Sequence, residues 1–201
     1  MKRKIIILCL ITLILTGCTI VRIDTTSIDN IVNVIFSKEG SLYNRVGRGY
    51  KYYVPRGVTY IDSSGSNDKL YSNGVYYYLY LDEISYYYKQ SMEYKEDSTK
   101  FYSRKIDNNG KIGYLEITEK NDNLYLIEFV YNYAKIEALV PKKDINNTVL
   151  NSSYILSTIK YNHNIIKLSL EEDFLKNKEE KYNVYTQKNK DESSFLRYEE
   201  K

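Results

Sequence analysis

The run Val75-Tyr76-Tyr77-Tyr78-Leu79-Tyr80-Leu81 is the clearest strand signal in this sequence. Successive side chains of a strand point to opposite faces, so the run divides into two faces of large residues. The odd-numbered residues form one face, and Tyr76, Tyr78 and Tyr80 form the other. Because both faces are bulky and apolar, the run predicts a central strand that is covered on both sides. Asn73-Gly74, directly before it, predicts a tight hairpin turn.

Further strands follow this run at short intervals. Turn signals at 107–110 and 121–123 separate segments with strand character, which are residues 101–106, 111–119, 124–131 and 133–140. Short segments joined by tight turns predict an antiparallel meander. Weaker signals predict strands at 50–54 and 58–61, a polar loop at 63–68, a continuation of the central strand at 84–88, and a last strand at 165–170.

Two helices flank the predicted sheet in the sequence. The first follows a cap at Thr26 or Ser27 and carries apolar residues at helical spacing. The second begins at Asp144, runs to about residue 160, and places Ile145, Val149, Leu156 and Ile159 on one side. We therefore predict an α+β fold in which an N-terminal and a C-terminal helix pack on an antiparallel sheet.

Two segments of the sequence resemble segments of a known protein family. The entry Tyr50-Lys51-Tyr52-Tyr53-Val54-Pro55 and the closing strand–helix unit 124–161 resemble those of the Mog1/PsbP-like α/β/α sandwich proteins. The resemblance implies an accessory or binding role, since that fold is not chiefly a catalytic one. It transfers no functional residue, because fold by itself does not specify function.

The start of the chain carries a localisation signal. Three cations at positions 2–4 precede an apolar run at 5–15, which is shorter than the roughly 17–25 residues of a membrane span. The next residues, Leu15-Thr16-Gly17-Cys18, resemble the lipobox of bacterial lipoproteins. The resemblance implies cleavage between Gly17 and Cys18, and a diacylglycerol on Cys18 that holds the protein on the outer face of the cell membrane. The alternative is an ordinary cleaved signal with a chance cysteine.

This interpretation divides the chain into four parts. They are a signal peptide (1–17), a lipid-anchored tether (18–26), a globular domain (27–170) and a charged tail (171–201), in which a short helix at 171–181 is possible. Without the signal, basic and acidic side chains are equal in number, which argues against a nucleic-acid partner. The remaining cysteine would be acylated, so we expect no disulfide, and we expect no cofactor.

Few residues suggest chemistry. His163 is the single histidine, and a solvated loop position is favoured over a general base or metal ligand. The alternating oxygen donors from Asp62 to Asp68 resemble the start of a calcium loop, but the acid required twelve residues on is replaced by Asn73. A plain loop is therefore favoured there.

Three carboxylates on the predicted strands are the remaining candidates. Glu116 and Glu128 could be neighbours, with Glu137 on a third strand, and paired carboxylates are what glycoside hydrolysis uses. A solvated sheet face is the favoured interpretation of all three.

The sequence leaves three functions open. The leading hypothesis is a non-enzymatic lipoprotein whose domain binds a partner protein or an envelope component. The second is a cell-wall glycan-binding module that uses the face of Tyr76, Tyr78 and Tyr80, although packing of that face is favoured. The third is a hydrolase that uses the strand carboxylates.

Overall fold

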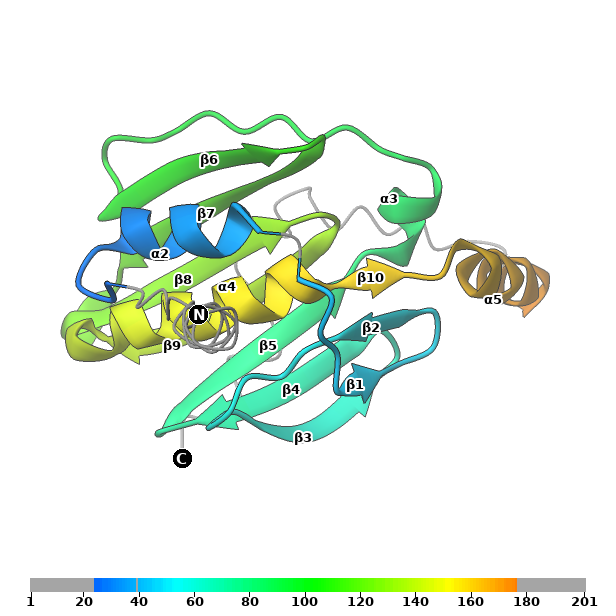
Figure 1. Ribbon diagram of the computed structural model, residues 1–201, viewed down its shortest axis with the longest axis horizontal. Helices are drawn as coiled ribbons and strands as arrows, with labels where there is room; N and C mark the ends of the chain where they lie inside the picture. Colours follow the sequence, from blue (N-terminus) through cyan, green and yellow to red (C-terminus); the bar gives the residue numbers. More distant parts are fainter. Residues whose placement is uncertain (1–23, 39, 177–201) are drawn as a thin grey trace, which may run out of the picture.

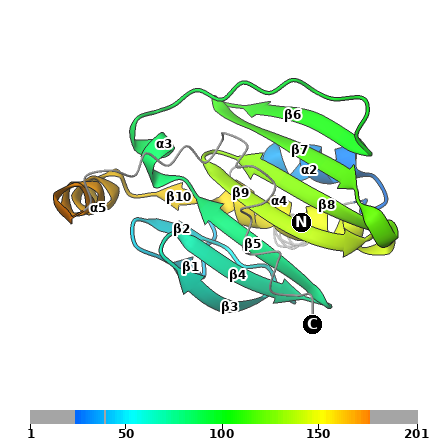
Figure 2. The ribbon, with the colours of Figure 1, turned by 180° about the vertical axis from the view of Figure 1, so that it is seen from behind.

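The computed structural model describes residues 24–38 and 40–176, and its centre is a seven-stranded antiparallel sheet (Figure 1). In spatial order the strands are β3 (Thr59–Ser64), β4 (Asn67–Ser72), β5 (Val75–Leu81), β9 (Ala134–Pro141), β8 (Leu124–Tyr131), β7 (Lys111–Glu119) and β6 (Tyr102–Asn108). The run quoted first is therefore an interior strand, as predicted. The predicted cover on both sides is not found among the described residues, because α2 and α4 pack on one face of the sheet only (Figure 2). The α+β class with an antiparallel sheet is also as predicted.

The sheet consists of two meanders joined at β5 and β9. After β5 the chain forms the short helix α3 (Glu83–Tyr87) and then crosses to the far edge, where β6 begins the second meander. The predicted continuation of the central strand at 84–88 is therefore wrong. Asp82 ends the strand because its carboxylate accepts the Ser85 N–H at 2.8 Å and caps α3.

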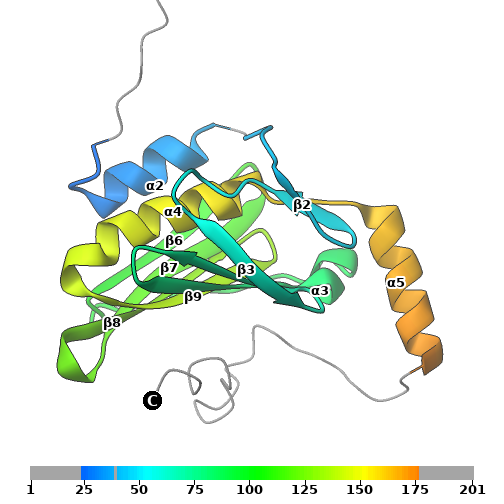
Figure 3. The same cartoon turned by 90° about the horizontal axis from the view of Figure 1, so that it is seen from below.

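The inner face of the sheet packs against two helices. Figure 3 shows α2 (Ile28–Phe36) and α4 (Ile145–Thr158) side by side on this face. Both predicted helices are confirmed: Ser27 caps α2, and α4 follows the 3₁₀ turn η2 (Lys142–Asp144). Asp144 makes no side-chain cap hydrogen bond. The inward residues Tyr77 and Leu79 of β5 are fully buried beneath these helices.

A small second sheet completes the cover of the inner face. It consists of β1 (Arg45–Val46), β2 (Tyr50–Tyr52) and β10 (Lys160–Tyr161), in the order β1-β2-β10. The predicted last strand at 165–170 is wrong, because α5 (His163–Lys176) occupies it. The Asn162 carboxamide oxygen accepts the N–H groups of Asn164 and Ile165, and this cap starts a helix directly after β10. The helix crosses the predicted tail boundary at residue 171, and residues 177–201 lie outside the described part.

The predicted polar loop at 63–68 is also wrong. These residues form the ends of β3 and β4 around a turn at Gly65, whose φ is +59°. Glycine adopts this left-handed conformation at no steric cost, so the two strands can pair up to the turn. On β4, Asp68, Leu70 and Ser72 alternate inward, which places a carboxylate within the core.

Tyr52 ties the small sheet to this carboxylate. Its hydroxyl donates a hydrogen bond of 2.5 Å to Asp68 Oδ2, and the Tyr50 hydroxyl lies 3.5 Å from Oδ1. Burial raises the pKa of the Asp68 carboxyl, and burial together with the hydrogen bond to Asp68 raises the pKa of the Tyr52 hydroxyl. Arg45 on β1 adds a second tie, because its guanidinium carbon lies 3.3 Å from the ring centre of Tyr60 on β3.

We expect Tyr52→Phe to lower the free energy of unfolding by about 1.5–3 kcal/mol, because a buried carboxylate loses its shortest hydrogen bond. Tyr53→Phe is the matched control: Tyr53 is half-buried, and its backbone N–H rather than its hydroxyl bonds to Thr158. It should change stability by less than about 0.5 kcal/mol. Urea unfolding at neutral pH measures both values, and equal values would contradict the role given to Tyr52.

Candidate functional site

The outer face of the sheet carries a line of polar side chains across five neighbouring strands. The register places Tyr78 of β5 opposite Glu137 of β9, and Glu137 opposite Glu128 of β8. Glu128 lies opposite Glu116 of β7, which lies opposite Ser103 of β6. We call Glu116, Glu128 and Glu137 the carboxylate row. Their predicted proximity is confirmed, and Figure 2 shows this face, with α2 and α4 behind the sheet.

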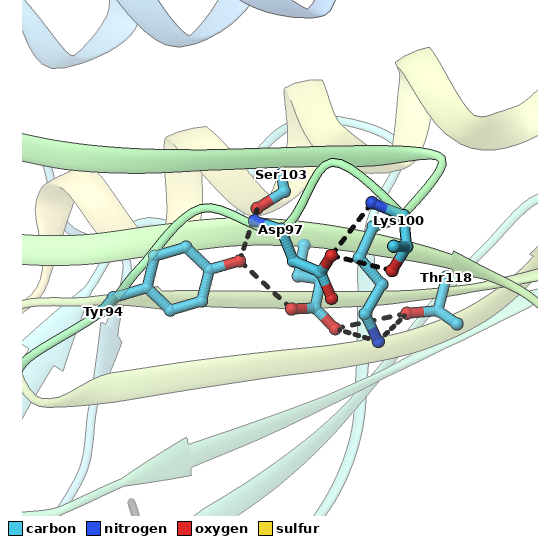
Figure 4. A network of polar contacts seen from close by, with 7 residues as sticks. Tyr94, Asp97, Lys100, Ser103 and Thr118 are labelled. Carbon is cyan, nitrogen blue, oxygen red and sulfur yellow. Dashed lines mark hydrogen bonds and ion pairs between the residues drawn. The ribbon is translucent and has the colours of Figure 1, made fainter.

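One end of the row is closed by the connection between α3 and β6. Lys100 Nζ lies 2.9 Å from Glu116 Oε1 and 3.3 Å from the hydroxyl of Thr118 (Figure 4). The Tyr94 hydroxyl lies 3.1 Å from Glu116 Oε2 and 2.8 Å from the Ser103 hydroxyl. The hydrogen bond to Glu116 raises the pKa of Lys100, so this lysine is charged and neutralises the end of the row.

Tyr94 also holds the connection flat against the sheet. Its ring stacks on Tyr114 of β7 with 4.1 Å between ring centres and 2° between planes. The Asp97 N–H donates to the Ser103 hydroxyl at 2.8 Å. Burial, with a smaller contribution from Glu116, raises the pKa of Tyr94 to about 12, so its hydroxyl stays protonated.

At the other end of the row, Glu137 pairs with a lysine of its own strand. Lys135 lies two residues before Glu137 on β9, and its Nζ is 2.6 Å from Glu137 Oε1. The same amine lies 5.0 Å from the ring centre of Tyr80. Glu137 is 8% exposed, so this ion pair is largely shielded from water. Removing one partner of such a pair leaves a buried charge without compensation.

The middle carboxylate has no such partner. Among the described residues, no cation forms an ion pair with Glu128. Burial raises its pKa, the neighbouring Glu137 raises it further, and Lys135 acts in the opposite direction. Like charges directly opposite one another on paired strands destabilise a sheet. The centre of the row is therefore a half-buried negative site that costs stability.

The three tyrosines considered as a glycan platform are buried or half-buried on the outer face of the sheet. Tyr78 is 4% exposed, while Tyr76 and Tyr80 are half-buried. Lys69 Nζ lies 4.1 Å from the ring centre of Tyr76 and 5.3 Å from that of Tyr78. A lysine amine therefore lies near each of these rings, with Lys135 beside Tyr80, and this leaves less ring surface on which a sugar could stack.

The other candidates lie apart from the row. His163 is exposed, as predicted, but it is the first residue of α5 rather than part of a loop, and it stacks on Tyr87 with 5.0 Å between ring centres. Asp62 lies on edge strand β3, whereas Asp68 faces the core and bonds Tyr52, so the two do not share a calcium loop. Among residues 24–38 and 40–176, no group of His, Cys, Asp and Glu is arranged to hold a metal ion.

The predicted lipidation and cleavage residues, Gly17 and Cys18, lie outside the described residues. No helix in the described part of the chain has both the length and the apolar character needed to cross a membrane. No protein-family model matches the sequence, and comparisons with curated proteins and with solved structures also find no significant match.

Sequence reasoning found the three carboxylates but missed their partners. Lys135 could have been found, because residues two apart on a strand share a face. Tyr94 and Lys100 had no such signal, since they come from a connection without regular structure, and only the folded chain brings them to Glu116.

Removing the charge of Glu128 should stabilise the protein near neutral pH. The pKa of Glu128 is higher in the folded state than the 4.5 of a free carboxyl, so ionisation of this side chain opposes folding. The loss of stability is complete above the folded-state pKa, and it is absent below pH 4.5, where the carboxyl is protonated in both states. Glu128→Gln should therefore raise the free energy of unfolding by about 0.5–1 kcal/mol at neutral pH. The gain should vanish under acid conditions, below the pKa of the unfolded state.

Urea unfolding across this pH range measures the gain. Glu93→Gln removes a charge from an exposed position outside the row and should change stability little at any pH. A gain for Glu128→Gln that persists in acid would contradict the charge argument.

Proposed function

We propose that this chain is a bacterial lipoprotein held on the outer face of the cell membrane by a diacylglycerol on Cys18. Its domain binds a partner protein through the outer face of the sheet and catalyses no reaction. The signal-like start and the residues Leu15-Thr16-Gly17-Cys18 support the anchor. The carboxylate row supports the binding role.

The observation that carries the binding role is Glu128, which has no ion pair within the described residues. The two carboxylates at the ends of the row have lysine partners. The middle carboxylate lowers the stability of the fold, and an uncharged side chain at the same position would avoid this cost. Positions that break a local stability rule are expected at functional sites. A lysine or arginine of a partner would supply the missing charge, and such charge-assisted hydrogen bonds are among the strongest in proteins.

The structure favours this role over the two alternatives. Within the described residues nothing indicates catalysis, since lysines pair with Glu116 and Glu137 and no hydrogen bond orients Glu128 as a general acid. Glycan binding by the tyrosine face has less support, because the amine of Lys69 lies over Tyr76 and that of Lys135 lies near Tyr80. If the partner were an envelope polymer instead of a protein, the polymer would need ammonium groups to pair with the carboxylate row.

The anchor is tested by replacing its sulfur. Cys18→Ser should abolish incorporation of radioactive palmitate in growing cells and release the protein from the membrane fraction, because a diacylglycerol thioether cannot form on serine. Wild type should be labelled and should sediment with membranes. A serine variant that still takes up label and sediments would overturn the anchor.

The binding face is tested with the intact acylated protein as bait in detergent-solubilised membranes. Glu128→Gln should lower recovery of the partner about tenfold, since a charge-assisted hydrogen bond contributes about 1.5–3 kcal/mol. Glu93→Gln, on the exposed connection, should recover the partner as wild type does. Capture that is unchanged in Glu128→Gln would rule out the carboxylate row as the binding face.

A further inference from the structure

We propose that the end of the domain at which α2 and α4 begin rests on the lipid bilayer, with the Phe101 ring and the Lys142 amine at the contact. This inference relies on the proposed Cys18 anchor and adds an orientation to it. Figure 3 shows the starts of both helices at one end of the domain, while α3 and α5 lie toward the other end.

The first argument is the point at which the chain enters the domain. Asn146 at the start of α4 donates from Nδ2 to the carbonyl oxygens of Thr25 and Thr26, at 2.9 and 3.1 Å. Asn30 Nδ2 donates to the Asp24 carbonyl oxygen at 3.1 Å. These bonds hold the entry point beside the starts of both helices, so the tether is attached to this end of the domain.

The second argument is the length of that tether. Five residues lie between Cys18 and Asp24, and the six Cα–Cα steps from one to the other span no more than about 20 Å in any conformation. A lipid-bearing Cys18 therefore keeps this end within that distance of the headgroups. Tethering also raises the effective local concentration of the bilayer to about the millimolar range or above, so even a weak contact is occupied.

The third argument is the chemistry of the surface at this end. An open hollow of about 360 Å³ lies between the starts of α2, β6 and α4, and its lining includes Ile28, Phe101, Lys142 and Ile145. Phe101 is 44% exposed and is one of the large apolar side chains that the described surface presents to solvent. The same lining also contains the polar side chains of Thr26 and Asn146, so an exposed aromatic ring stands beside a hollow of mixed polarity, which is what the bilayer interface accepts.

Lys142 places a cation beside this ring. Its Nζ lies 5.6 Å from the Phe101 ring centre, and a lysine in this position can extend its amine to lipid phosphates while its alkyl chain follows the ring. Asp29, which also lines the hollow, is compensated by Arg104 at 2.8 Å. The carboxylates of Asp24 and Asp144 are matched in number by Lys142 and Lys143, and the turn before β8 at the same end adds one lysine and one aspartate, so these formal charges are balanced.

The absence of tryptophan from the chain gives a direct test. Acylated full-length protein carrying Phe101→Trp is reconstituted into phosphatidylcholine–phosphatidylglycerol vesicles with or without brominated acyl chains. We expect the single tryptophan to lose about half of its fluorescence in brominated vesicles, because interfacial rings lie at the headgroup level. Tyr88→Trp is the matched control, since Tyr88 is 67% exposed directly after α3, toward the far end, and should lose little.

Lys143→Trp provides a second reporter at the same end, from a position that is exposed and independent of the hollow. It should be quenched like the Phe101→Trp reporter. Equal quenching of Tyr88→Trp, or no quenching at either position near the tether, would overturn the proposal. A blue-shifted Phe101→Trp emission without bromine quenching would show that protein, such as a second copy, covers the hollow, and would overturn it as well.

Flotation of the same vesicles separates the two proposals. Protein that floats with the lipid but shows no quenching near the tether retains its anchor and lacks the proposed orientation. Protein that does not float lacks the anchor, and both proposals then fail.

Discussion

The pairing of β5 with β9 is the constraint on which the rest of the structure depends. It joins two meanders that are each complete by themselves, and it sets the register of the whole sheet. On the inner face it places Leu79 opposite Ile136, both fully buried beneath the helices. On the outer face it places Tyr78 opposite Glu137. Because side chains alternate along a strand, a shift of one residue would exchange these two faces.

Side chains alternate between the two faces of the sheet, and the two faces differ in how their carboxylates are paired. The inner face is covered by α2, α4 and the small sheet, and Asp68, the one carboxylate buried there among the described residues, accepts a hydrogen bond from Tyr52. The outer face places three carboxylates in adjacent register and neutralises the outer two with lysines. In the first arrangement, the hydrogen bond from Tyr52 offsets part of the cost of burying Asp68. Packing does not explain Glu128, whose raised pKa reflects a cost to folding and whose use we assign to binding.

The domain therefore has two surfaces with different chemistry. The carboxylate row lies in the middle of the outer sheet face, whereas Phe101 and Lys142 lie at the end where α2 and α4 begin. If that end rests on the bilayer, the sheet lies away from the membrane, and its outer face does not point toward the lipid (Figures 2 and 3). A partner could then reach Glu128 without displacing lipid, so the proposed orientation and the proposed binding face are compatible.

The sequence alone determined the central strand 75–81, both flanking helices and the turns at 73–74, 107–110 and 121–123, because each depends on local periodicity and turn chemistry. It missed the hairpin of β3 and β4, which was predicted as a polar loop. The lipobox-like residues at 15–18 are likewise a local pattern, and the anchor they suggest stays a prediction. Only the tertiary structure decided the strand order, the helix at 163–176 and the partners of the carboxylates. Tyr94 and Lys100 reach Glu116 through a connection without periodicity, and contacts of this kind depend on the chain path rather than on neighbours in the sequence.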